Sequence, residues 1–326
     1  MWVIRYTGQD QPGSTSATIR KRNLSMRSDL IQTHIDRNRE TECLSEAYTG
    51  HRDRIMQLIA STAKDLTDGE NQKCSSIVLL GGGNCLDVDL PAVAELFEVV
   101  HLVDLDETAV RSVVNAYPER ANQFRVHAPW DIAEPLLSLT SRDFRPEEDN
   151  RDHCIKVLQA LSSENGIADI PEADVVVSLC VLSQLIDSLA VLIREDHPAF
   201  VNALKALRMG HLRRMLSLSR PGGVAIFVSD IVSSDTAEQL KTATTEQIPE
   251  LVKTFVGEKN FFSGTNPSVI LSELNVLSRL ETGPDTVHTI DPWRWDMGER
   301  AYAVYAFRIQ KKLPQSAEFE ADDTGD

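Results

Sequence analysis

Several features are scarce or missing in this chain of 326 residues, and each absence excludes a class of protein. The five cysteines are scattered without any CxxC pair, which gives little support to a disulfide framework or a zinc knuckle. No apolar run approaches about 18 residues, the length that a membrane-spanning helix needs. Basic residues are also few: 33 Lys and Arg stand against 49 Asp and Glu, a formal net charge of −16. We therefore expect no metal site and no nucleic-acid or membrane partner.

The overall composition is that of a folded protein with polar segments at both ends. Hydrophobic residues make up 42% and charged residues 25% of the chain, which is ordinary globular usage. Residues 1–40 show no sustained periodicity, so we predict a flexible N-terminal arm there. The run of acidic residues over 313–326 predicts a disordered acidic tail. The stretch from Met1 to Ser16 lacks a charged segment followed by an apolar one, so we expect a cytoplasmic protein.

The middle of the chain alternates short runs rich in Val and Ile with stretches of helical periodicity. Such alternation is typical of a parallel sheet that helices cover on both faces. Near the end, two strand-like segments at 287–290 and 301–309 have a short connection, which forces an antiparallel pair. The predicted strands before them cover 76–80, 99–103, 124–127, 174–179 and 224–228, and the predicted helices cover 42–66, 90–97, 108–117, 152–161 and 200–218.

These elements predict a single α/β domain over residues 41–312. Its fold would be doubly wound: a mostly parallel seven-stranded sheet with helices on both faces and an antiparallel C-terminal strand pair. Two loop insertions, near 137–170 and 233–266, are longer than a minimal crossover. Long loops at the carboxyl ends of parallel strands usually carry substrate determinants, so we expect them to cover a pocket suited to a small molecule.

Three consecutive glycines follow the first predicted strand. Gly81, Gly82 and Gly83 lead from this strand towards a helix, and such a turn brings backbone N–H groups close to an anionic ligand. Asp104 stands 21 residues after Gly83, at the end of the second predicted strand. A carboxylate at that offset can accept both hydroxyls of a ribose. A tight turn without any ligand is the alternative interpretation.

Two nucleotide-binding patterns use turns of this kind, and the sequence departs from both. A P-loop requires Gly-Lys followed by Ser or Thr, and no such triplet follows the glycines. The dinucleotide fingerprint GxGxxG would place its last glycine at Leu86. Both patterns are therefore weakened, although a ribose-containing ligand is still expected.

With its motifs taken in order, the chain resembles the class I S-adenosylmethionine-dependent methyltransferases over roughly residues 45–310. The final antiparallel strand pair is also a trait of that family. The resemblance implies a Rossmann-like domain with S-adenosylmethionine as the cofactor. It depends on five elements: the glycine turn at Gly81–Gly83, Asp104 after the second strand, Asp131 after the third, Asp174–Gln184 around the fourth, and Arg220–Gly223 before the fifth.

The resemblance also implies roles for particular residues. A base that removes a proton from the methyl acceptor would be His51, His127 or Asp187. On the acceptor side of the site we expect Ser183 and Gln184 at the exit of the fourth strand, with Trp293 and Trp295 in a turn between the last two strands. The cofactor would be held by Gly81, Gly82, Gly83, Asp104, Leu105, Asp131, Ile132, Leu179 and Cys180.

The function expected from these observations is methyl transfer to a small-molecule oxygen or nitrogen acceptor, since the sulfonium is already a good leaving group and the protein mainly aligns the reactants. An NAD-dependent oxidoreductase is one alternative, supported by the glycine turn and Asp104. A non-catalytic S-adenosylmethionine-binding protein is another. It is motivated by Leu79, where the family often has an acidic residue, and by Cys85 in place of the third glycine of GxGxG.

Overall fold

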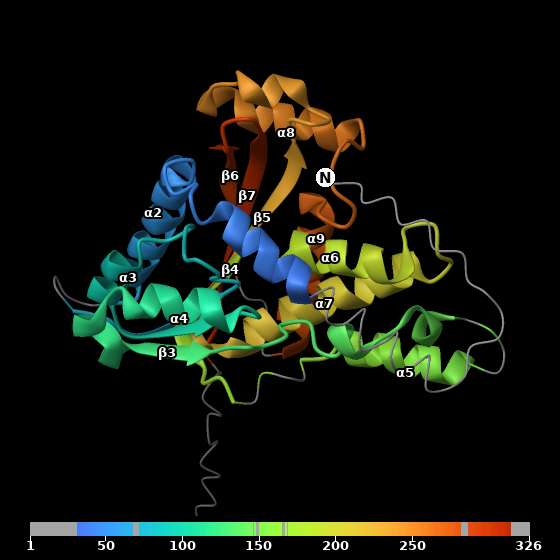
Figure 1. Ribbon diagram of the computed structural model, residues 1–326, viewed down its shortest axis with the longest axis horizontal. Coiled ribbons are helices and arrows are strands. Elements are labelled where there is room, and N and C mark those ends of the chain that lie inside the picture. The colour runs from blue at the N-terminus through green and yellow to red at the C-terminus, as the bar shows by residue number, and fades with distance from the viewer. Residues whose placement is uncertain are drawn as a thin grey trace, which may run out of the picture.

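The computed structural model describes residues 31–67, 72–145, 147, 150–164, 167, 169–281 and 286–313. Within these residues, seven strands form one sheet in the order β3-β2-β1-β4-β5-β7-β6 (Figure 1). The strands are β1 (Cys74–Leu80), β2 (Phe97–Val103), β3 (Phe124–His127), β4 (Ala173–Leu179), β5 (Ser219–Ser233), β6 (Thr286–Asp296) and β7 (Ala301–Gln310).

The directions of the strands confirm the predicted fold class. Strand β1 pairs in parallel with β2 and β4, β2 with β3, and β4 with β5, whereas β7 runs antiparallel to both β5 and β6. Every residue of β4 is buried, as expected for a central strand that has helices on both faces. The mostly parallel sheet and its antiparallel C-terminal pair are therefore both confirmed.

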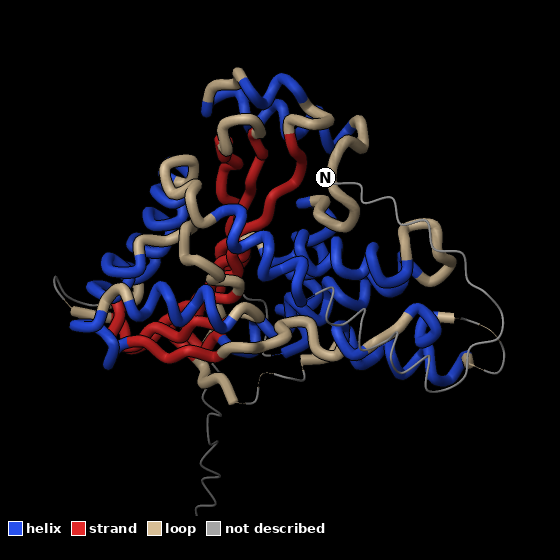
Figure 2. Tube along the Cα trace, in the orientation of Figure 1, coloured by secondary structure: helices blue, strands red, loops and turns tan. Residues whose placement is uncertain are grey.

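Helices cover both faces of the sheet (Figure 2). Alternate residues of β1 belong to two different apolar cores: Val78 and Leu80 pack with α6 and α7, while Ile77 and Leu79 pack with α2 and α3. This division follows from the period of two along a strand. The helices are α2 (Thr49–Asp65), α3 (Leu90–Leu96), α4 (Glu107–Asn115), α5 (Arg151–Leu161), α6 (Val181–Ile193), α7 (Phe200–Leu218), α8 (Ile248–Gly257) and α9 (Pro267–Glu281).

The two predicted insertions contain regular structure. The region 137–170 includes α5, which packs against α7, and the region 233–266 includes α8, which contacts β6. In Figure 1, α8 lies beyond the ends of β5, β6 and β7. Strands β5 and β6 both extend well past their predicted ranges, because the antiparallel pairing continues after the apolar run of β5 has ended.

The chain departs from the sequence-based expectations at both of its ends. Residues 31–41 are helical, so the flexible arm predicted over 1–40 is wrong for 31–40. The segment contacts the domain through polar side chains, which apolar periodicity does not reveal. Residues 1–30 and 314–326, which carry the rest of the predicted arm and the predicted tail, lie outside the described residues.

The turn predicted around Trp293 and Trp295 is also wrong, because both tryptophans lie within β6. There Trp293 pairs with Val304 and Trp295 with Tyr302 of β7. Aromatic residues favour such strand positions, where they pack across the pair. Among the helices of the described residues, none is both long and apolar enough to cross a bilayer.

Candidate functional site

The glycine turn lies where the direction of strand order reverses. Successive strands run outward from β1 to β2 and β3, and β4 starts again on the other side of β1. Ligands of doubly wound sheets bind in the crevice outside the carboxyl ends of the strands at such a switch point. Gly81 has φ +78°, and a Cβ there would lie 2.1 Å from Val181 Cγ2 at the start of α6. Glycine is therefore required where this turn passes the exit of β4.

Asp104 directly follows β2 and holds the glycine turn in place. The N–H of Gly83 donates to Asp104 Oδ2, and the N–H of Asp106 donates to Oδ1, each at 2.8 Å. Burial raises the pKa of Asp104, and backbone hydrogen bonds from Asp106, Gly83 and Leu105 partly oppose that shift. A carboxylate offers about four lone-pair sites, so these donors leave some capacity for a ligand. The ribose contact of Asp104 stays a prediction, now with a geometry that permits it.

The helical segment 31–41 crosses the glycine turn; it is the deepest blue helix in Figure 1. Asn38 donates through Nδ2 to Asp106 Oδ2 at 3.1 Å, and the side chain of Asn84 donates to the carbonyl of Asn38. A Cβ on Gly83 would lie 2.8 Å from Asn38 Oδ1, which shows how closely the segment approaches the turn. The segment therefore covers the place where the cofactor is expected.

The same segment also reaches α6. Arg37 pairs with Asp187 at 3.2 Å, and His34 Nε2 lies 3.0 Å from Ser188 Oγ. Burial, with the nearby charge of Arg37, lowers the pKa of His34 to about 4, so this imidazole is neutral at neutral pH. Asp187, one of the predicted bases, is 60% exposed and engaged in this ion pair.

The exit of β4 is formed by Leu179 and Cys180, both buried. Cys180 adopts the left-handed conformation, with φ +50°, as the N-cap of α6. Burial raises the pKa of its thiol well above the ordinary value, and the charges of Asp230 and Asp87 add to that shift. The thiol is therefore protonated and does not act as a nucleophile.

Ser183 stands one turn into α6 and points towards β5. Its hydroxyl donates to Asp230 Oδ1 at 2.6 Å. Asp230 lies where the pairing of β5 with β7 shifts register, before Val232. Burial raises its pKa to about 6, and the hydrogen bond from Ser183 partly offsets that effect. Asp230 is a candidate that sequence reasoning missed, because an acid inside a predicted strand gives no motif.

An aromatic cluster lies beside this carboxylate. The Nε1–H of Trp293 donates to His51 Nδ1 at 3.1 Å, and the ring of Trp295 stacks on His51 with centroids 4.3 Å apart. Tyr48 meets Trp295 edge-on at 4.9 Å. His51 Nε2 lies 3.0 Å from Asp87 Oδ1, although their angle is not that of a hydrogen bond. The Nδ1 lone pair is therefore occupied, and the proton of a neutral His51 faces Asp87.

Other predicted residues lie on the far side of the glycine turn. Asp131 accepts from the N–H groups of Ala133 (2.9 Å) and Leu137 (3.3 Å), so its carboxylate caps its own loop. His127 Nε2 lies 3.0 Å from His101 Nδ1, and burial lowers the pKa of both imidazoles, that of His101 to about 4. The adenine contact of Asp131 and the basic role of His127 stay predictions.

The remaining predicted residues have less specific surroundings. Ile132 is buried in the core between β1 and α7, whereas Leu105 and Gln184 are half-buried. Gln184 hydrogen-bonds to His34 of the covering segment, and that bond raises the pKa of His34 slightly against the effect of burial. The predicted roles of Leu105 and Gln184 stay hypotheses.

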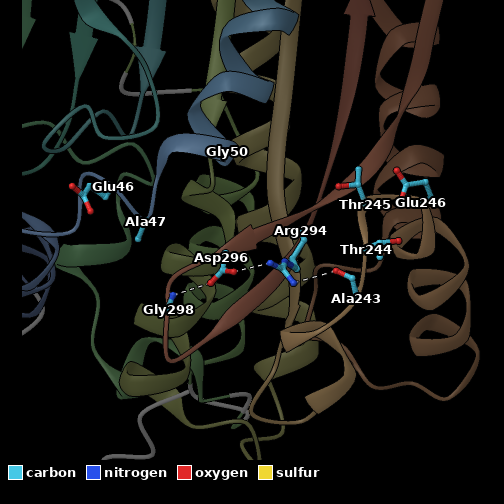
Figure 3. A pocket seen from close by; sticks show the side chains of 10 residues that line it. All are labelled: Glu46, Ala47, Gly50, Ala243, Thr244, Thr245, Glu246, Arg294, Asp296 and Gly298. Carbon is cyan, nitrogen blue, oxygen red and sulfur yellow. Dashed lines mark hydrogen bonds and ion pairs between the residues drawn. The ribbon is translucent and has the colours of Figure 1, made fainter.

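An open concavity of about 710 Å³ lies next to the aromatic cluster (Figure 3). Its lining includes Glu46 and Glu246, together with an ion pair between Arg294 and Asp296 at 2.7 Å. Arg294 also donates to the carbonyl of Ala243, so it ties β6 to the segment before α8. None of the predicted cofactor residues lines this concavity, which we therefore distinguish from the crevice at Gly81–Gly83.

No protein-family model matches the chain, and no curated protein matches it either. Among solved structures, it is similar to the 1,6-didemethyltoxoflavin-N1-methyltransferase of Burkholderia thailandensis, with 13% identity, TM-score 0.44, and 93% of each chain covered. A putative S-adenosylmethionine-dependent methyltransferase of Methanococcus maripaludis has 12% identity and TM-score 0.41 over 95% of this chain and 100% of that one. The N-methyltransferase NodS of Bradyrhizobium japonicum has 11% identity and TM-score 0.39 over 80% and 96%.

The chain's own strand order confirms the fold that the resemblance to class I methyltransferases implies. The sheet has its switch point between β1 and β4, and β7 lies antiparallel between β5 and β6. What the solved structures bind or methylate is a property of those proteins.

Proposed function

We propose that this protein is an S-adenosylmethionine-dependent methyltransferase that acts on a small-molecule oxygen or nitrogen acceptor. The observation that carries the proposal is the arrangement of Asp104 and Gly83 at the switch point. A buried carboxylate that keeps free lone pairs beside a glycine turn can hold the two hydroxyls of a ribose. The bound cofactor supplies a methyl group on a positively charged sulfur.

The residues beyond the turn favour this cofactor over NAD. In the dinucleotide fold a helix opens directly after the glycines, and its N-terminus receives the pyrophosphate. Here residues 84–89 form turns, and α3 begins only at Leu90, with the Asp89 side chain as its N-cap, accepting from the N–H of Ala92. A short helix capped by its own carboxylate offers no site for a pyrophosphate, whereas S-adenosylmethionine carries none.

The departures at Leu79 and Cys85 are compatible with the proposal. Leu79 is fully buried in the core between β1 and α2, and Cys85 is buried with φ +52°, so it adopts the left-handed conformation that a glycine would otherwise supply. Burial raises the pKa of the Cys85 thiol to about 12, which keeps it neutral.

Labelled methyl transfer tests the proposal. The purified protein is incubated with methyl-tritiated S-adenosylmethionine and a cell extract from which macromolecules have been removed. We expect tritium in a small molecule, and we expect none with the Asp104→Ala variant. Binding of the cofactor without any transfer of label, to small molecules or to added protein, would instead indicate the non-catalytic alternative.

A further inference from the structure

Asp230 is enclosed by other elements and yet half-exposed, whereas the residues before it on β5, from Val224 to Ser229, are buried. Asp230 therefore keeps access to molecules from solvent. Ser183, which is also half-exposed, is the one side chain among the described residues that donates to this carboxylate. Lone pairs of Asp230 therefore remain available to a small molecule.

The groups around Asp230 come from several elements and are mostly acidic or aromatic. From α6 the charge of Asp187 raises its pKa, and from α2 His51 lowers it. The charge of Asp230 acts in turn on three groups by raising their pKa: Cys180 at the exit of β4, and Tyr302 and Tyr305 of β7.

Asp87 and Tyr48 belong to the same surroundings. The charge of Asp87 raises the pKa of Cys180 and of Tyr48. The rings of Tyr48 and Tyr302 both pack against Trp295, with centroids 4.9 and 5.5 Å away, so the aromatic cluster extends to Tyr302.

The nearby cations are already engaged with other carboxylates. Arg37 pairs with Asp187 at 3.2 Å, and Arg300, which lies next to Tyr302, is 3.3 Å from Asp235. The surroundings of Asp230 are therefore mainly acidic and aromatic. Such an environment attracts an ammonium group through charge and through cation–π contacts, and it repels a phenolate.

We infer that the methyl acceptor is a small primary or secondary amine, and that Asp230, positioned by Ser183, is the catalytic residue that takes its proton. The inference deepens the proposed function and rests on it. An oxygen acceptor is disfavoured because ionising it beside Asp87 and Asp230 would place like charges together.

The proposed step balances in charge and atoms. The bound ammonium gives one proton to the carboxylate of Asp230, which exposes the nitrogen lone pair. That pair forms the bond to the methyl carbon while the carbon–sulfur bond breaks and its electrons stay on sulfur. The products are the N-methylammonium and S-adenosylhomocysteine, and the proton on Asp230 passes to water. A carboxylate whose pKa burial raises to about 6 is a stronger base than an ordinary aspartate.

Binding measurements test the inference separately from turnover. Calorimetry first measures S-adenosylhomocysteine alone, then 2-phenylethylamine, 2-phenylethanol and 4-ethylphenol, each with and without saturating S-adenosylhomocysteine. We expect the amine to bind at pH 7.5 and the alcohol and phenol to bind far more weakly. Asp230→Asn should weaken amine binding about 30-fold and leave S-adenosylhomocysteine binding unchanged.

Two further variants make the experiment specific. Asp291→Asn removes an exposed carboxylate elsewhere on β6 and should change nothing. Ser183→Ala should lower methyl transfer to the amine and move the acid limb of its pH profile upward, because the hydrogen bond that lowers the pKa of Asp230 is lost. A serine with a merely structural role would leave that limb in place.

The outcomes separate the two proposals. If S-adenosylhomocysteine binds but the phenol or alcohol binds better than the amine, or if Asp230→Asn binds the amine normally, the inference is overturned and the proposed function stands. If S-adenosylhomocysteine does not bind, the proposed function itself fails.

Discussion

Two aspartates lie near the carboxyl ends of sheet strands, and we propose different roles for them. Asp104, after β2, accepts from two backbone N–H groups, one from the glycine turn and one from its own loop. Asp230, in β5, accepts from the hydroxyl of Ser183 and from its own backbone N–H. Burial raises the pKa of both. Asp104 is buried, whereas Asp230 keeps partial exposure. We therefore expect the carboxylate held by backbone amides to be a fixed anchor and the one bonded to Ser183 to be available for proton transfer.

The largest expected effect is on cofactor binding. Replacing Asp104 with Ala removes a charged acceptor of two ribose hydroxyls, so the Kd for S-adenosylhomocysteine should rise about 1000-fold. Calorimetry measures it, and circular dichroism checks that the fold is retained. Asp89→Ala is the matched control, because Asp89 also accepts from a backbone N–H but lies away from the turn. An unchanged Kd in Asp104→Ala would show that Asp104 does not bind the cofactor.

The next effect is on the rate of methyl transfer. With 2-phenylethylamine as acceptor, Asp230→Asn should lower kcat about 300-fold, the size expected for loss of a general base. Its Kd for S-adenosylhomocysteine should match that of the unchanged protein, which is the reverse of the Asp104→Ala result. Single-turnover assays with tritiated cofactor measure the rate. If Asp230→Asn lost cofactor binding as well, the proposal of separate roles for Asp104 and Asp230 would be contradicted.

Stability should also depend on pH through Asp230. In the folded chain its pKa is about 6 instead of the ordinary 3.8. Its protonated form therefore stabilises the fold below pH 3.8, and this contribution is lost as the pH rises through 6. Asn does not ionise, so Asp230→Asn should be more stable than the unchanged protein by up to about 3 kcal/mol above pH 6, and the gap should shrink towards pH 4. Urea unfolding at several pH values measures this difference in the free energy of unfolding. A difference that does not change with pH would contradict the raised pKa of Asp230.

The smallest expected effect concerns the segment that covers the anchor. Asn38→Ala removes the hydrogen bond to Asp106, which should raise the Kd for S-adenosylhomocysteine about fivefold, mainly through faster dissociation. Stopped-flow measurements follow the release. Gln32→Ala is the control, because Gln32 lies on the same helix and, among the described residues, its side chain bonds to Asp36 of that helix. Equal dissociation rates in the two variants would show that segment 31–41 does not close the site.

Much of the fold could be predicted from the sequence, because strands and helices in a doubly wound domain each carry their own apolar pattern. The predicted range 124–127 coincides with β3, and 200–218 coincides with α7. The helix over 181–193 was missed, because its residues are apolar almost all round and follow the apolar run of β4 without a break. Periodicity gives no boundary in such a stretch.

The residues of the candidate site also fall into two groups, those that the sequence predicted and those that it did not. The glycine turn and Asp104 could be found because a fixed spacing along the chain corresponds to a fixed place at the sheet edge. Asp230, Asp87 and the covering segment could not, because their contacts join elements distant in sequence and involve polar side chains. The packing of Trp293 and Trp295 against His51 was not predicted either, because it joins β6 to α2, which lie far apart in the sequence.

The measurement that tests the central claim most directly is titration calorimetry of the purified protein with S-adenosylhomocysteine, with NAD as the parallel ligand. The account predicts micromolar binding of S-adenosylhomocysteine and no binding of NAD. Binding of NAD alone, or of neither ligand, would contradict it.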